Sequence, residues 1–145
     1  MAATLIAADA TVTVAALVGW HERHKAASFA IEAALARKAL LLPAAVIVES
    51  YAILTSLPAN HRLTHADAFH LLRESYGTAR VVGLRTRDTW SMVRRWSVAP
   101  TGGGDAYDAM LIDAAREAGA KVLLTFRRNE LERIAGTGLE VVEPV

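Results

Sequence analysis

The chain has 145 residues, a length that suits one domain with a substantial core, and 53% of its residues are apolar. It contains no cysteine, so disulfides, thiolate zinc sites and a cysteine nucleophile are excluded. Its net charge of only +1 at pH 7 does not identify nucleic acid as a ligand. Composition therefore predicts one compact domain and leaves the function to particular residues.

Residues 1–18 form an apolar stretch at the start of the chain. This stretch has no basic first part and carries Asp9 at its centre, which argues against a signal peptide and against a membrane span. We expect a first strand followed by a helix there, in a cytoplasmic protein without a membrane segment.

Short apolar runs alternate with helical patterns along the whole chain. Strands are expected at residues 4–8, 40–42, 80–84, 121–126 and 139–142, and helices from residue 11 and at 21–38, 43–57, 64–77, 86–96 and 105–118. Thr64 and Asp67 have the spacing of a capping box at the start of one of these helices. The alternation predicts a single α/β domain with a mainly parallel central sheet flanked by helices on both faces.

Three carboxylates lie within runs that should be largely buried: Asp9, Glu49 and Asp108. Acids are seldom fully buried unless they are paired or bound to a cation. Asp9 directly follows the first strand, at the sheet edge where ligands bind in parallel α/β folds. The three acids therefore indicate a metal site, provided that the fold brings them together.

Each acid also has an alternative explanation. Asp9 is well placed to cap the helix that follows it. Asp105 could cap the helix that begins there, with Asp108 as its partner in an acidic variant of the capping box. Glu49 shares a helix stripe with Val46 and Ile53, so its side chain is expected to point inward, where a carboxylate needs a partner. No basic residue lies in that segment, which favours a role in a site.

The order of these acids, with their neighbouring residues, resembles the PIN-domain family, especially the VapC-type ribonuclease toxins of type II toxin–antitoxin pairs. The matching segments are Asp9-Ala10-Thr11 after the first strand, Val48-Glu49 in the helix after Pro43, Tyr107-Asp108-Ala109, and the run from Gly119 to Thr125. The resemblance implies a PIN-like fold and an acidic, catalytic triad of Asp9, Glu49 and Asp108 around a divalent metal. Asp9 and Asp108 are its expected direct ligands.

The same resemblance implies the cofactor and the partners. Mg²⁺ is the expected ion, with Mn²⁺ as an alternative, because both prefer carboxylate and water ligands. RNA is the expected substrate, cleaved by metal-activated water, and a cognate antitoxin and a homodimer are expected as well. Which RNA is cleaved cannot be read from the sequence, because recognition of single-stranded RNA depends on loop shape.

One position departs from the family. Two residues after the threonine that ends the fourth strand, the family usually has a polar or acidic group, whereas this chain has Arg127. Arginine cannot ligate a cation, so the departure argues against a second tightly bound metal, and Asn129 or Asp105 are the candidates to replace the missing group. Thr11, Thr125 and Arg127 are the candidate substrate-binding residues, the last through a phosphate.

Two other functions fit parts of the pattern. A PIN-like protein with weakened catalysis, acting only through its partner, would explain Arg127. A phosphoacceptor receiver domain also places acids beyond parallel strands, but it expects paired acids after the first strand, which this chain lacks. The metal-dependent endoribonuclease accounts for more of the residues than either alternative.

Overall fold

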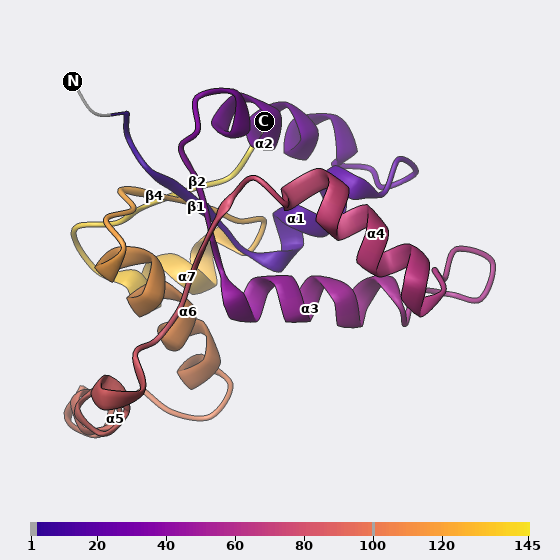
Figure 1. Ribbon diagram of the computed structural model, residues 1–145. Helices are drawn as coiled ribbons and strands as arrows, with labels where there is room; N and C mark the ends of the chain where they lie inside the picture. The colour runs from indigo at the N-terminus through magenta and orange to yellow at the C-terminus, as the bar shows by residue number, and fades with distance from the viewer. Residues whose placement is uncertain (1–2, 100) are drawn as a thin grey trace.

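A five-stranded parallel sheet forms the centre of the protein in the computed structural model, which describes residues 3–99 and 101–145 (Figure 1). The elements in chain order are β1 (Ile6–Ala8), α1 (Ala10–Leu17), α2 (His24–Ala36), β2 (Leu40–Pro43), α3 (Ala44–Leu54), α4 (His65–Tyr76), β3 (Arg80–Val82), a 3-10 turn (Thr86–Asp88), α5 (Thr89–Val98), α6 (Asp105–Glu117), β4 (Val122–Leu124), α7 (Arg128–Ala135) and β5 (Glu140–Val142). The strands lie in the order β3-β2-β1-β4-β5. The expected α/β fold with a parallel sheet is confirmed.

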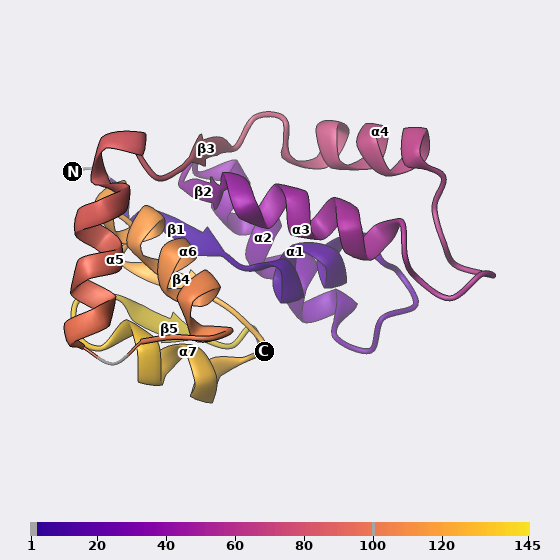
Figure 2. The ribbon, with the colours of Figure 1, turned by 90° about the horizontal axis from the view of Figure 1, so that it is seen from below.

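Successive strand residues face opposite sides of the sheet, as a strand's two-residue period requires. Ala8, Leu42 and Leu124 pack in one apolar cluster with residues of α1, α2 and α4. Ala7, Leu41 and Leu123 pack in a second cluster with residues of α6 and α7. Figure 1 shows α2 above the strands and α6 and α7 below them, and Figure 2 shows the same elements from below. The continuous apolar runs of the strands are explained by burial on both faces.

Several element boundaries follow the sequence expectation closely. The Thr64 hydroxyl accepts the Asp67 backbone N–H at 3.1 Å, so Thr64 caps α4 as the first half of the expected capping box requires. The strands other than β2 are shorter than expected, and β2 is one residue longer. The segment expected as one helix from residue 86 begins with a 3-10 turn before α5. Helix α7 was not expected from the sequence. Residues 1, 2 and 100 lie outside the described part of the chain.

Buried polar groups join three helices on one side of the sheet. The hydroxyls of Thr13 in α1 and Ser50 in α3 lie 2.7 Å apart, and Ser50 also donates to the carbonyl oxygen of Val46 at 2.6 Å. The Tyr76 hydroxyl, at the end of α4, donates to the carbonyl oxygen of Thr13 at 2.6 Å. These bonds fix how α3 and α4 sit against α1, the helix that directly follows Asp9. Within the described residues, no helix is both long and apolar enough to cross a bilayer.

Replacing Tyr76 by Phe tests this network. Tyr76 is 5% exposed, so Tyr76→Phe removes one buried hydrogen bond while keeping the ring in place. We expect a loss of about 1 kcal/mol in the free energy of unfolding, seen as a fall in Tm of about 2–4 °C by thermal melting. Tyr107→Phe, at a side chain that is 76% exposed, is the matched control and should leave Tm unchanged. Equal melting of the two variants would contradict the structural role of the Tyr76 hydroxyl.

Candidate active site

The candidate site lies at the carboxyl ends of β1, the middle strand of the sheet, and its neighbour β4. After β1, the chain adds β2 and β3 on one side of this strand and then β4 and β5 on its other side. The strand order therefore reverses between β1 and β4. Such a switch point is where open parallel sheets bind ligands. Asp9 directly follows β1, and Thr125 directly follows β4.

Asp9 is buried, and both of its carboxylate oxygens accept hydrogen bonds. Oδ1 accepts the Thr11 hydroxyl at 2.5 Å and the backbone N–H groups of Thr11 at 3.0 Å and Val12 at 3.3 Å. Oδ2 accepts the Thr125 hydroxyl at 2.5 Å. Asp9 therefore caps α1 and also faces β4, so the cap and site explanations for this residue do not exclude each other.

The two threonines link the loops that follow β1 and β4. The Thr11 hydroxyl also accepts the backbone N–H of Phe126, and the Thr125 hydroxyl accepts that of Arg127, both at 2.9 Å. Thr125 is fully buried, so no part of it is open to a substrate. We therefore assign Thr125 to positioning Asp9 rather than to binding substrate, and Thr11 shares that role.

Asp108 lies in the first turn of α6 and is half-buried. Its two carboxylate oxygens accept hydrogen bonds from the two terminal nitrogens of Arg127, at 3.1 and 2.9 Å. This bidentate pair is the strong form of an arginine–carboxylate contact. The expected cap at Asp105 is not formed, because α6 begins after Gly104 without a side-chain cap.

Glu49 lies on the exposed side of α3, so the expectation that it points inward was wrong. The buried positions of α3 are Val46, Ser50 and Leu54, spaced four residues apart, which places Glu49 beside the buried stripe instead of on it. Its electrostatic environment still includes the acids Asp9 and Asp108. Glu49 thus faces the margin of the site.

Burial and mutual repulsion shift the proton affinities of two of these acids. Burial raises the pKa of Asp9, although hydrogen bonds from Thr11 and Thr125 and the charge of Arg127 oppose the rise. Partial burial raises the pKa of Glu49, and the charges of Asp9 and Asp108 raise it further. Acids that repel one another in this way gain from a nearby cation.

The acids do not form a closed metal centre with their side chains in these positions. Within residues 3–99 and 101–145, no group of three or more His, Cys, Asp or Glu side chains is placed to hold a metal ion. Glu49 is exposed, and Arg127 takes both oxygens of Asp108. The donor chemistry still suits Mg²⁺ or Mn²⁺, because Oδ2 of Asp9 accepts one hydrogen bond and keeps a lone pair.

Sequence reasoning missed Glu130, the second partner of Arg127. Its Oε2 accepts hydrogen bonds from Nε of Arg127 at 3.1 Å and from a terminal nitrogen of the same guanidinium at 2.7 Å. Their spacing of three residues was the available signal. Neither suggested replacement for the missing fourth group joins the acids: Asp105 pairs with Arg133 at 2.9 Å, and Asn129 is exposed on α7.

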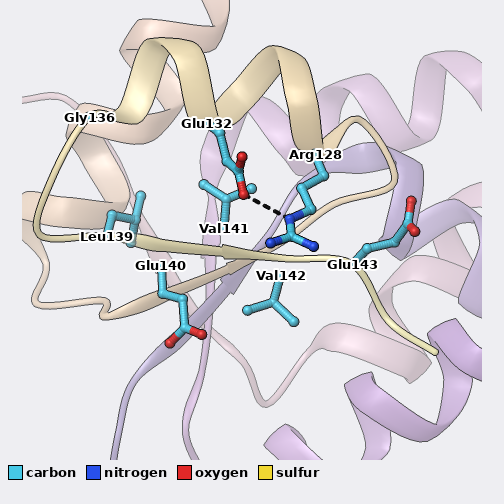
Figure 3. Close-up of a pocket in the computed structure, with 8 residues that line it drawn as sticks. All are labelled: Arg128, Glu132, Gly136, Leu139, Glu140, Val141, Val142 and Glu143. Carbon is cyan, nitrogen blue, oxygen red and sulfur yellow. Dashed lines mark hydrogen bonds and ion pairs between the residues drawn. The ribbon is translucent and has the colours of Figure 1, made fainter.

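A separate hollow of about 590 Å³ lies between α7 and β5 (Figure 3). Arg128 and Glu132 form a 2.7 Å ion pair on its α7 side, and Glu140 and Glu143 belong to the β5 side. None of the predicted site residues lines this hollow. The acids near the ends of β1 and β4 therefore remain the candidate site.

Comparison with known proteins agrees with this geometry. Residues 6–136 match the family model described as PIN domain. The chain belongs to the PIN-domain family. This PIN domain is 32% identical to ribonuclease VapC40 of Mycobacterium tuberculosis (strain CDC 1551 / Oshkosh) over 119 residues, which are 82% of this chain and 84% of the relative. It is also 32% identical to ribonuclease VapC27 of Mycobacterium tuberculosis over 112 residues, 77% of each chain.

Solved structures share the fold of this PIN domain. PAE2754 from Pyrobaculum aerophilum superposes with a TM-score of 0.63 and 22% identity, over 96% of this chain and 90% of the other. Mycobacterium tuberculosis VapC20, described as a sarcin–ricin loop cleaving toxin, gives a TM-score of 0.58 and 16% identity, over 81% of this chain and 86% of the other. At these identities the likeness supports the fold alone.

Replacing Glu49 by Gln tests the repulsion among the acids. Since the pKa of Glu49 is raised in the folded protein, its ionised form costs stability above that pKa, and the cost is absent below the ordinary value of 4.5. Without metal, Glu49→Gln should raise Tm by about 1–2 °C at pH 7, and the gain should disappear below pH 4.5. Glu32→Gln, at an exposed position of α2, is the control. A Tm difference that stays constant with pH would contradict this account.

Proposed function

We propose that this PIN domain is an endoribonuclease that depends on Mg²⁺ or Mn²⁺ and acts as the toxin of a toxin–antitoxin pair. The observation that supports the proposal most is the buried Asp9 carboxylate, held by Thr11 and Thr125 at the carboxyl ends of β1 and β4, whose charge, with that of Asp108, reaches Glu49. The names of VapC40 and VapC27, both ribonucleases, support it. Hydrolysis by water is the reaction that an acid cluster of this kind can assist without a protein nucleophile.

Each residue has a proposed task. Asp9 and Asp108 would hold the ion, which when bound lowers the pKa of a water and offsets charge that develops on the phosphate. Thr11 and Thr125 keep the Asp9 carboxylate in one orientation. Glu49, exposed at the margin and with a raised pKa, is suited to accept a proton at Oε from the attacking water. Arg127 offers two parallel N–H donors to a phosphate when it is not bound to Asp108.

The proposal includes a cognate antitoxin and a homodimer, in the cytoplasm. An apolar groove between α3 and α4 supports a protein partner, because it exposes large side chains: Val48, Tyr51, Phe69 and Val81. Exposed apolar patches of this kind commonly mark protein interfaces.

The alternative is a PIN-like binding protein with weakened catalysis. One observation favours it: Arg127 occupies both oxygens of Asp108, a residue that the nuclease needs. The two functions differ in a simple assay, because only the nuclease cleaves RNA when Mg²⁺ is added and stops when the ion is chelated.

Replacing Asp108 by Asn is the direct test. Asp108→Asn removes a carboxylate of the site, and we expect RNA cleavage to fall by at least about 100-fold, measured on purified protein with labelled RNA and Mg²⁺. Asp113→Asn is the matched control on the same helix, because Asp113 pairs with Arg95 at 3.4 Å, and it should keep activity. Circular dichroism checks that both variants fold. Full Mg²⁺-dependent cleavage by Asp108→Asn would reject the site assignment, and RNA binding without cleavage by the unaltered chain would favour the binding protein.

A further inference from the structure

Arg127 contacts two carboxylates from two different helices. Its guanidinium binds both oxygens of Asp108 in α6 and also Oε2 of Glu130 in α7. Its backbone N–H is held by the Thr125 hydroxyl, so the start of its side chain is fixed beside the carboxylate that Thr125 positions. A single cation thus occupies the place where the proposed function requires a metal ion.

Metal binding and this ion pair compete for the same atoms. A guanidinium that donates to both oxygens of a carboxylate takes one lone pair on each oxygen and offsets the negative charge that would attract a metal ion. A divalent ion on Asp108 would lie within a few ångströms of the guanidinium, where two positive charges repel strongly in a partly buried site. Asp108 therefore cannot serve Arg127 and a metal ion fully at once.

Glu130 offers Arg127 a second position. Arg127 Nε and a terminal nitrogen already bind Glu130, and the side chain of Glu130 is 60% exposed. The Arg127 side chain is itself 36% exposed, so it can turn toward solvent without crossing the core. Releasing Asp108 therefore does not leave the guanidinium without a carboxylate partner.

We propose that Arg127 is an internal competitor for the metal ion: it neutralises Asp108 in the metal-free protein and moves toward Glu130 when a divalent ion binds. This inference rests on the proposed function, since it concerns the same metal site. It makes metal affinity depend on how the guanidinium is shared between the two acids. Removing Arg127 should strengthen metal binding, whereas removing its second partner should weaken it.

Calorimetric titration of the full chain with MnCl₂ tests both directions. Arg127→Gln should bind Mn²⁺ about tenfold more tightly than the unaltered chain, because a charged hydrogen-bonded competitor is gone. Glu130→Gln should bind it several-fold more weakly, because Asp108 becomes the sole strong partner of Arg127. Neither substitution changes a side chain that caps α7, whose start has no side-chain cap.

The pair formed by Arg128 and Glu132 supplies matched controls. It lies on the same helix with a 2.7 Å contact, and neither residue contacts Asp108 within the described chain. Arg128→Gln changes the net charge as Arg127→Gln does, and Glu132→Gln changes it as Glu130→Gln does. Both controls should alter Mn²⁺ affinity by less than about twofold, because screening weakens distant charges. Larger control effects would mean that net charge, not contact with Asp108, sets the affinity, and would overturn the inference.

The outcomes also separate this inference from the proposed function. Unchanged or weaker Mn²⁺ binding by Arg127→Gln, or tighter binding by Glu130→Gln, would overturn the inference, while Mg²⁺-dependent RNA cleavage by the unaltered chain would leave the proposed function standing. If neither the unaltered chain nor any variant binds Mn²⁺, both fail. Tighter Mn²⁺ binding by Arg127→Gln and weaker binding by Glu130→Gln, with unchanged affinity in both control variants, would establish Arg127 as the competitor.

Discussion

Burying a carboxylate is costly unless its oxygens are hydrogen-bonded, paired or bound to a cation, and the hydrogen bonds of Asp9 meet this need by joining the ends of β1 and β4. Its oxygens accept the hydroxyls of Thr11 and Thr125, and each hydroxyl in turn accepts a backbone N–H from the segment after β4. The resulting network sets the separation of the two loops that carry the site. Without it, the acid would be both costly to bury and free to turn.

The second constraint is electrostatic. Asp9, Glu49 and Asp108 are coupled through their charges, since the charges of Asp9 and Asp108 raise the pKa of Glu49. Asp9 is buried, so water screens its charge poorly, and a nearby positive charge offsets the repulsion. Arg127 supplies that charge in the absence of a metal ion. Arg127 is therefore physically connected to the acids, although a basic side chain cannot replace a metal ligand.

Features that depend on local rules could be predicted from the sequence. The cap at Thr64 and the position of Asp9 after an apolar strand follow from residue types at fixed spacing. The error at Glu49 arose because three- and four-residue spacing identifies the buried face of a helix only to within one position. Glu49 lies next to the buried residue Ser50 in α3, yet its own side chain is exposed. The contact of Asp108 with Arg127 was not predictable, because the residues lie 19 positions apart and meet only through the packing of α6 and α7.

The chain order of the network also decides when the site becomes complete. All three acids precede β4, yet the hydroxyl that holds the second oxygen of Asp9 comes from Thr125, 116 residues further along the chain. A ribosome that has made the chain only as far as α6 has already joined every acidic residue of the site. The organised carboxylate must wait until β4 has emerged and has docked beside β1, so a truncated chain retains the acids without their arrangement.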